Sequence, residues 1–420
     1  MNQDPFILTL AEACDAAIAD GRYAEAANLL GFLIGTGGDD GLNLYLLGHV
    51  QYELGDYVMA EAALRLSVAL DPSRSEAFND LAAALFRQNR DAEALTFIRQ
   101  ALKLNPHMPE AEESDSIWLL RYGRFREGWR KYEARYRTSE GLPLSRNFPQ
   151  PQWKGEPIHD RTILLHAEQG FGDAIQFARY APLVAERGAK VILEVHPGLA
   201  TTLRTLPGVS QLIERGVPLP PFDLHCPLVS LPLAFGTELD SIPASIPYVA
   251  ADPARVFAWR NRIGPRRVMR IGVAWSGNPV HREDARRSIP LSRLAGLLRD
   301  RPDREFHVLQ NDVRQGDRAA LAELPHLRDH SALLRDFADS AALVSLMDVV
   351  ITVDTAIAHL AGAMGWPVWV MLPAVPDWRW MLHRDDSPWY PSMWLFRQTR
   401  RDDWDPVLME VARQLDDMLS

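Results

Sequence analysis

The chain has 420 residues, enough for about two or three domains, and its hydrophobic fraction of 47% is ordinary for a protein with buried cores. Its formal net charge of -10 argues against a general binder of nucleic acid or of anionic membranes. Cys14 and Cys226 suggest neither a disulfide framework nor a zinc site, and no apolar run reaches the ~20 residues of a membrane span, so we expect a soluble cytoplasmic protein.

Residues 1–137 contain a motif that recurs at a constant step of 34 residues. Its copies are Gly21-Arg-Tyr, Gly55-Asp-Tyr, Asn89-Arg-Asp and Gly123-Arg-Phe. Small residues at Ala26, Ala60 and Ala94 keep the same step, which lets the second helix of each pair pack closely on the first. This period is the tetratricopeptide (TPR) signature. We therefore predict an α-helical TPR solenoid that binds a partner protein or peptide, or serves as a scaffold or a homo-oligomer surface.

Residues 138–160 are rich in proline, serine and glycine, which predicts a linker. From residue 161 onward, short apolar runs alternate with helical spacing, as in a doubly wound α/β fold. The predicted strands cover 161–167, 190–195, 211–213, 222–226, 270–275, 306–309, 349–353 and 368–372. The predicted helices cover 174–186, 199–206, 257–263, 291–298, 340–347 and 356–364, with a final helix after Asp405-Pro406.

Gly264-Pro265 separates the two series of strands and helices. We predict two Rossmann-like halves, residues 161–263 and 264–420, with a cleft between their strand ends. In such folds the ligands bind outside the carboxyl ends of the strands.

The first predicted strand is followed by Gly170, Gly172 and Asp173. A dinucleotide fingerprint would require Gly or Ala at position 175, where the chain has Ile175, so a nicotinamide site is disfavoured even though Glu194 could mimic its ribose-binding acid. Asp173 has two open interpretations, a helix N-cap and a catalytic base.

A second strand-to-helix turn begins at Asp354-Thr355-Ala356. Free backbone N–H groups and the helix dipole favour a phosphate at such a turn, where Thr355 adds a hydroxyl. His359 follows four residues later, on the same face of the predicted helix. The alternative is an ordinary capped helix with a buried histidine.

Other candidate residues also lie near predicted strand ends. Ser276 and Asn278 follow one strand, and Gln310 follows the next. Arg286 or Arg287 could clamp a diphosphate, or the arginines could belong to a solvated loop. Trp378 and Trp380 could stack on a base or sugar, or pack between domains.

These motifs resemble the bacterial heptosyltransferase family, glycosyltransferase family nine, whose two-Rossmann fold is called GT-B. Gly172-Asp173 is similar to the family's Gly-Asp turn, whose Asp is the proposed catalytic base. The stretch from Asp354 to Leu360 resembles its donor motif Asp-Thr-x-x-x-His-Leu. The segment from Arg286 to Pro290 lies where the family carries a basic residue before Trp-Pro. This chain departs from the family pattern at Ala356, which replaces a glycine, and by having arginine rather than lysine at the basic position.

The resemblance implies an inverting, metal-independent glycosyltransferase that moves a sugar from a nucleotide-diphosphate sugar to an acceptor hydroxyl on a protein or surface glycan. The first half would bind the acceptor, with Asp173 as base, and the second half the donor. The implied donor-binding residues are Ser276, Asn278, Arg286, Arg287, Gln310, Asp354, Thr355, Ala356 and His359. No cofactor and no metal is implied, because we interpret Asp403-Trp-Asp405 as a helix cap.

Two other functions stay open at this point. One is a catalytically inactive assembly protein that keeps the TPR and GT-B architecture. The layout also resembles the protein O-GlcNAc transferase family, in which TPR repeats precede a GT-B unit, although no stretch of this chain matches its donor motifs.

Overall fold

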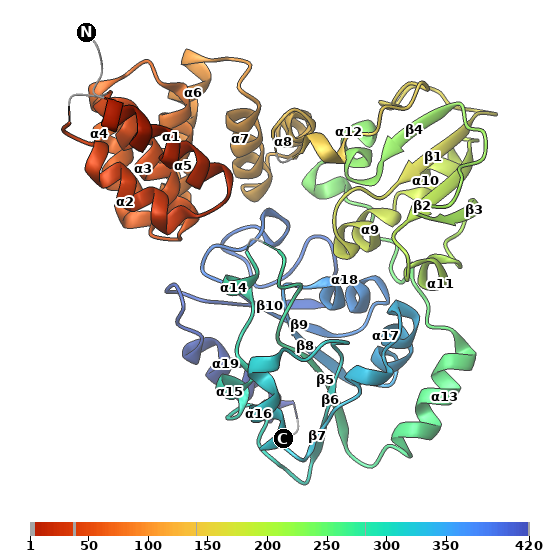
Figure 1. The fold of residues 1–420 in the computed structure, drawn as a ribbon. Helices are drawn as coiled ribbons and strands as arrows, with labels where there is room; N and C mark the ends of the chain where they lie inside the picture. Colours follow the sequence, from red (N-terminus) through yellow and green to blue (C-terminus); the bar gives the residue numbers. More distant parts are fainter. Residues whose placement is uncertain (1–4, 37–38, 140, 282, 419–420) are drawn as a thin grey trace. The chain divides into compact units, whose positions relative to one another are not determined.

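The computed structural model describes residues 5–36, 39–139, 141–281 and 283–418 (Figure 1). The remaining positions of the predicted domains, residues 1–4, 37–38, 140, 282 and 419–420, lie outside the described residues. The chain divides into two compact units, Met1–Ser145 and Arg146–Ser420. Within the described ranges, no helix has the length and the apolar character needed to cross a membrane.

The first unit is a series of helix pairs, as the 34-residue period predicts. Its helices are α1 (Pro5–Ala19), α2 (Tyr23–Leu33), α3 (Asp40–Glu53), α4 (Tyr57–Leu70), α5 (Ser75–Phe86), α6 (Asp91–Leu104), α7 (Pro109–Arg121) and α8 (Phe125–Tyr132), followed by the 3-10 turns η1 (Glu133–Tyr136) and η2 (Leu142–Leu144). The small residues at Ala26, Ala60 and Ala94 are fully buried. Because they have almost no side-chain bulk, the paired helices can approach closely, and the predicted solenoid is confirmed.

Gly48 allows the closest approach within one of these pairs. A Cβ atom at this position of α3 would lie 2.4 Å from Cγ of Leu64 in α4. We expect Gly48→Ala to lower the free energy of unfolding by ~1–3 kcal/mol, because overpacking forces side chains or backbone to shift. Gly31 in α2 has open space around its Cβ position, so Gly31→Ala should raise stability by ~0.5–1 kcal/mol. Urea unfolding followed by far-ultraviolet circular dichroism measures both, and effects of equal sign would contradict the packing argument.

The second unit begins with part of the predicted linker. Trp153 is buried there, and Gln152 forms a parallel bridge with His225. Residues 146–160 are therefore attached to the first of two parallel sheets. The order in that sheet is β3-β2-β1-β4, with β1 (Thr162–His166), β2 (Lys190–Val195), β3 (Val209–Glu214) and β4 (Leu224–Pro227). Its helices are α9 (Phe171–Ala178), α10 (Ala181–Glu186), α11 (Ala200–Leu203) and α12 (Leu231–Phe235), with the 3-10 turns η3 (Leu228–Ser230) and η4 (Leu239–Ser241).

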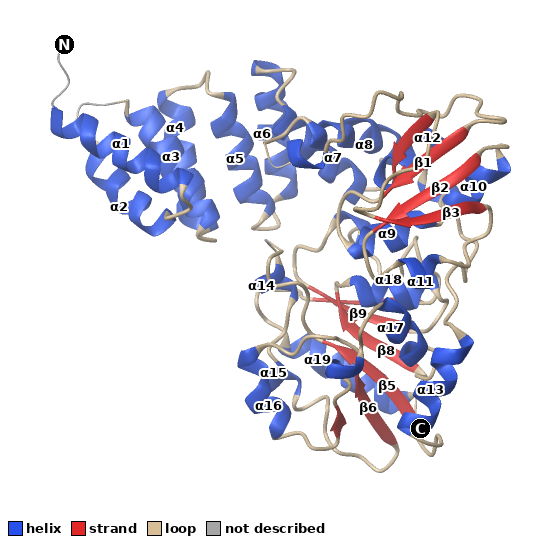
Figure 2. Cartoon of the chain, turned by 45° about the vertical axis from the view of Figure 1, so that its right-hand side comes forward, coloured by secondary structure: helices blue, strands red, loops and turns tan. Residues whose placement is uncertain are grey.

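The helix α13 (Pro253–Ile263) leads to the second sheet, whose order is β10-β9-β8-β5-β6-β7 (Figure 1; strands are red in Figure 2). Its strands are β5 (Met269–Ala274), β6 (Arg304–Val308), β7 (Leu327–Arg328), β8 (Val349–Val353), β9 (Val368–Leu372) and β10 (Met393–Arg397). Its helices are α14 (Asp284–Arg287), α15 (Leu291–Leu294), α16 (Arg318–Ala322), α17 (Phe337–Val344), α18 (Ala356–Ala363) and α19 (Asp405–Asp417), with the 3-10 turns η5 (Gln315–Asp317), η6 (Ser331–Leu333) and η7 (Trp378–Trp380).

This second sheet has the Rossmann strand order. The chain runs outward through β6 and β7, then returns to place β8 on the other side of β5. The reversal between β5 and β8 is the topological switch point, where ligands of such sheets bind at the carboxyl ends of the strands. The predicted order of folds, a TPR solenoid followed by two Rossmann-like halves with parallel sheets, is confirmed.

Some elements differ from the prediction. The single helix predicted for 174–186 is two helices, α9 and α10, because Pro182 lacks the N–H that a continuous helix would need. Strands β7 and β10 are additional to the predicted ones, and the helix predicted for 291–298 ends at Leu294 as α15. The predicted cap at the start of α19 is also wrong: the N-cap residue is Trp404, and Asp405 pairs with Arg293 at 2.7 Å.

Candidate functional site

The two strand-to-helix turns singled out in the sequence meet in the second unit. The helix after β1, α9, packs against the helix after β8, α18. A Cβ atom at Gly172 would lie only 2.7 Å from Cδ2 of His359, so glycine is what permits this approach. We call the contact between the turn 170–173 and the segment 354–359 the junction. It places the carboxyl end of β1 beside the switch point of the second sheet.

Asp173 lies in the first turn of α9 and faces the second half. Its Oδ2 accepts a hydrogen bond from the backbone N–H of Gly170 at 2.8 Å, and its Oδ1 forms an ion pair with Arg379 of η7. The N-cap residue of α9 is Gly170, and Asp173 is the N3 residue, so Asp173 does cap the helix start, but from N3 and not from the N-cap position. The Asp173 side chain is 19% exposed.

Arg379 is a site residue that the sequence analysis missed. Its Nε donates to Oε1 of Gln176 at 2.8 Å, and its second guanidinium nitrogen pairs with Asp377 at 2.9 Å. Its guanidinium also lies 4.3 Å from the centre of the Trp378 ring. Arg379 belongs to the second Rossmann-like half, and its contacts with Asp173 and Gln176 connect that half to the first one. The only feature of the sequence that points to Arg379 is its place between two tryptophans, shortly after the predicted strand 368–372.

The start of α18 has the properties of an anion site. Its N-cap residue, Thr355, makes no side-chain cap hydrogen bond, and Ala356 is the first helical residue. The first N–H groups of a helix carry partial positive charge and favour phosphate. The Thr355 hydroxyl is nearly buried and lies 3.2 Å from the hydroxyl of Thr352. In this structure that hydroxyl is directed inward, so the backbone provides the free donors.

His359 is buried behind this helix start. Its Nδ1 lies 3.0 Å from the hydroxyl of Tyr390, and its ring stacks on Trp380 with 5.4 Å between centroids. Burial lowers the pKa of His359 well below its usual value, and the charges of Arg379, Arg179 and Arg287 lower it further. The imidazole is therefore neutral, and a hydrogen bond donated by Tyr390 to Nδ1 would leave Nε2–H as a donor.

Asp354 precedes the N-cap residue of α18. It lies close to a negatively charged carboxylate and to positively charged arginines. Burial raises the pKa of Asp354 to about 6, and the nearby Asp377 carboxylate adds to this rise, while Arg287 and Arg379 oppose it. Two arginines from different segments therefore act on the carboxyl group that precedes α18. The indole N–H of Trp380 is buried beside it without a well-formed hydrogen bond.

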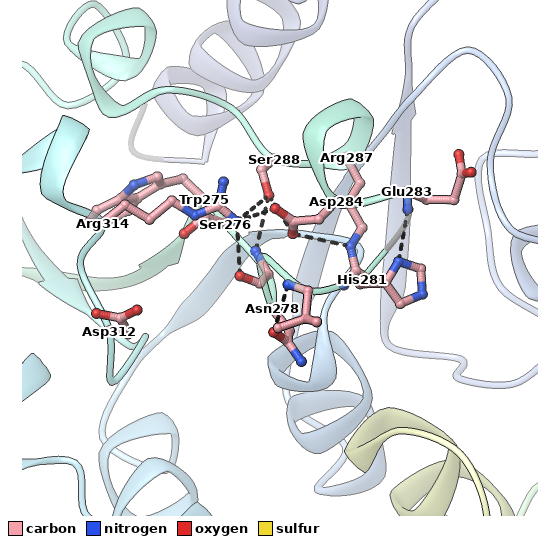
Figure 3. Close-up of polar contacts among 12 residues, drawn as sticks. Trp275, Ser276, Asn278, His281, Glu283, Asp284, Arg287, Ser288, Asp312 and Arg314 are labelled. Atoms are coloured by element: carbon pink, nitrogen blue, oxygen red, sulfur yellow. Dashed lines mark hydrogen bonds and ion pairs between the residues drawn. The ribbon is translucent and has the colours of Figure 1, made fainter. Parts of the chain in front are cut away.

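Several predicted donor residues form the loop after β5 (Figure 3). Gln310 Nε2 donates to Ser276 Oγ at 3.0 Å, and Gln310 Oε1 accepts from the backbone N–H of Trp275 at 2.9 Å. Asn278 Oδ1 accepts from the backbone N–H of Val280 at 3.1 Å. These side chains shape the loop, and the structure brings them to the β5 side of the switch point.

The two adjacent arginines of α14 have different surroundings. Arg286 pairs with Glu283 at 2.6 Å. Arg287 lies over Gly277, where a Cβ atom would be 2.7 Å from its guanidinium nitrogen. Its charge also reaches Asp354, whose pKa it lowers. Arg287 also lies 3.7 Å from Asp284, so of the two candidates it is the one placed beside Gly277 and near Asp354.

The remaining candidates have structural roles. Trp378 and Trp380 are buried, so they pack within the protein rather than offering an open face to a base or sugar. Glu194 is buried and pairs with Arg146, so it is not free to bind a ribose. Among the residues that the structure describes, no group of three or more His, Cys, Asp or Glu side chains is arranged to hold a metal ion.

Comparisons with known proteins support the repeats directly. Two family models, both described as tetratricopeptide repeat, match residues 43–74 and 75–108. The chain is 27% identical over 428 residues to Protein FlbA of Caulobacter vibrioides, a match that covers 94% of this chain and 70% of that protein. The name of that relative states no activity.

Solved structures of glycosyltransferases are distantly similar to the chain. ADP-heptose lps heptosyltransferase II of E. coli is 13% identical, with a TM-score of 0.44, over 61% of this chain and 98% of that one. A mutant O-GlcNAc transferase of Thermobaculum terrenum is 15% identical, with a TM-score of 0.37, over 100% of this chain and 92% of that one. At this distance, the chemistry of the site has to be inferred from its own residues.

Proposed function

We propose that the second unit is an inverting, metal-independent glycosyltransferase that uses a nucleotide-diphosphate sugar. The observation that carries this proposal is the convergence at the junction. Arg287 and Arg379 act on the start of α18, at the switch point of a Rossmann sheet, and Asp173 faces the same place from the other half. An anion site next to a carboxylate is what transfer from a diphosphate leaving group to a hydroxyl requires.

The donor diphosphate would bind at the start of α18. The backbone N–H groups there offer hydrogen bonds and the positive end of the helix dipole. Neutral His359 can add a donor from Nε2, and the planar fork of Arg287 can contact two phosphate oxygens. These groups would stabilise the charge that develops on the diphosphate as it leaves.

Asp173 would act on the acceptor. The acceptor oxygen forms a bond to the anomeric carbon while the bond from that carbon to the diphosphate oxygen breaks. Asp173 takes the hydroxyl proton, and the bonding electrons leave with the diphosphate. Attack from the side opposite the leaving group inverts the configuration of the sugar.

The repeats point to the class of acceptor. TPR solenoids are surfaces for protein contact, and their stacked repeats form extended binding surfaces. We therefore propose that the acceptor hydroxyl belongs to a protein or to a glycan attached to the cell surface, brought to the enzyme by contacts with the first unit.

A thermal-shift screen tests the donor site. UDP-, GDP-, ADP- and dTDP-linked sugars are each added to the full chain, with NADH as the dinucleotide control. A donor at 100 times its dissociation constant should stabilise the protein by about 2.7 kcal/mol. If no nucleotide sugar raises the melting temperature, or if only NADH does, the proposed donor site is wrong.

Donor binding should depend on pH through Asp354. Because the pKa of this buried carboxyl is about 6, it is charged at pH 8 and repels a diphosphate. The anion in turn favours the protonated carboxyl, so binding takes up a proton and affinity rises as the pH falls. We expect roughly threefold to tenfold tighter binding at about pH 6 than at about pH 8.

Isothermal titration with the nucleotide sugar found in the screen measures this effect, because its diphosphate diester does not itself titrate in that range. Asp354→Asn is the matched variant and should bind with nearly the same affinity at both pH values. An equal pH dependence in the parent and the variant would show that another group is responsible.

A further inference from the structure

Arg379 is positioned to contact two different partners. One is the Asp173 carboxylate, with which it pairs in this structure. The other is the anion site, because Trp380, the next residue of η7, stacks on His359 of α18 with 5.4 Å between ring centroids. The Arg379 charge also lowers the pKa of Asp354 there. The arginine is therefore next to both groups that the proposed reaction requires, the base and the diphosphate site.

The arginine side chain is held by several contacts: besides Asp173 it pairs with Asp377 at 2.9 Å, and its guanidinium lies over the Trp378 ring. Its side chain is 9% exposed, and Gln176 and Asp377 each accept a hydrogen bond from it. A guanidinium has five N–H donors in a planar fork, so it can keep some partners while exchanging another. Of these contacts, only the one with Asp173 involves a residue of the junction.

A bound diphosphate would compete with Asp173 for this guanidinium. It carries more negative charge than one carboxylate and offers oxygens in the geometry that arginine binds with two parallel hydrogen bonds. While Arg379 pairs with Asp173, one carboxylate oxygen is occupied by a cation and the other accepts from Gly170. A base held in this way has less capacity for an acceptor hydroxyl.

We propose that Arg379 is a positioning residue that exchanges partners during the reaction. It pairs with Asp173 while the donor site is empty and turns to the diphosphate when the donor binds, which releases Asp173 to accept a proton. This inference rests on the proposed function. Its consequence is an ordered reaction, in which the base becomes free only after the donor has bound.

The test compares diphosphate affinities by isothermal titration of the full chain. The probes are inorganic pyrophosphate, UDP, GDP and ADP, which need no knowledge of the sugar. Asp173→Asn should bind the probe about threefold to tenfold more tightly than the parent, because the competing pair is lost. Arg379→Gln should bind it more weakly. The double variant should show no gain over Arg379→Gln alone.

Two further variants control for general effects. Asp386→Asn removes an exposed carboxylate that pairs with Arg384 at 2.7 Å, on the same connection between β9 and β10. Its diphosphate affinity should equal that of the parent. Arg379→Met keeps the apolar stem and removes the charge, and it replaces Arg379→Gln in the cycle if circular dichroism shows that the glutamine variant is unfolded.

Each result decides between the two proposals. A gain from Asp173→Asn that disappears when Arg379 is replaced supports the exchange. If the gain is absent, or is equally large without the arginine, the exchange is wrong while the donor site stands. If no probe binds the parent chain at all, the donor site and the exchange both fail.

Discussion

Asp173→Asn is expected to reduce the rate of sugar transfer at saturating donor by about 10²–10⁴-fold, the usual contribution of a general base. Asparagine has nearly the same shape and can still accept the Gly170 N–H through its amide oxygen. It cannot take a proton from the acceptor hydroxyl. The fall should therefore appear in kcat, while the nucleotide sugar still binds.

The measurement is steady-state release of nucleoside diphosphate with the donor found in the thermal-shift screen. Asp386→Asn is the matched control, since it removes a carboxylate from the same unit without touching the junction, and its rate should equal that of the parent. Equal turnover by Asp173→Asn and the parent would reject Asp173 as the base. A parent without turnover would favour the inactive assembly protein.

Arg287→Ala should reduce kcat by about 10²–10³-fold, as expected when one donor to a developing negative charge is removed. Arg286→Ala should change kcat by less than about threefold, because a partly exposed ion pair such as Arg286–Glu283 contributes little. The two arginines are adjacent and have the same charge. Arg286 pairs with Glu283 at 2.6 Å, whereas Arg287 lies 3.7 Å from Asp284, packs over Gly277, and lowers the pKa of Asp354 by its charge.

Comparing Arg287→Ala with Arg286→Ala controls for the loss of one positive charge. Both lose one positive charge from α14, so a long-range electrostatic effect would lower both rates to a similar degree. We expect a difference of at least about 30-fold between them. Similar losses would mean that the leaving diphosphate is stabilised by the general field of the loop and not by Arg287 in particular.

The sequence predicts the elements that have a strong local pattern. The 34-residue period locates the helix pairs, and buried runs such as 349–353 and 368–372 match β8 and β9 at both ends. The pattern fails at β10, a single apolar run after a long irregular segment, and at the break before Pro182, where the helical spacing continues across the interruption. Edge strands and helix breaks depend on packing partners that periodicity does not show.

For the site, the motifs locate the turns but not their partners. Gly172 is recognisable as part of a glycine turn, while its contact with His359 joins residues far apart in the chain and follows only from the packing of α9 on α18. Arg379 is less conspicuous in the sequence than its neighbours Trp378 and Trp380, because aromatic side chains suggest stacking. In the structure both rings are buried, and it is Arg379 that contacts Asp173 and Gln176 of the other half.

The attachment of residues 146–160 to the first sheet, through Trp153 and the bridge at Gln152, has an evolutionary consequence. The α/β unit keeps its own anchoring segment, and the solenoid ends before it, with a separate core. Gain, loss or divergence of repeats can therefore change what the chain recognises without disturbing the residues around Asp173. Descendants of such a gene could inherit one chemistry and acquire different targets.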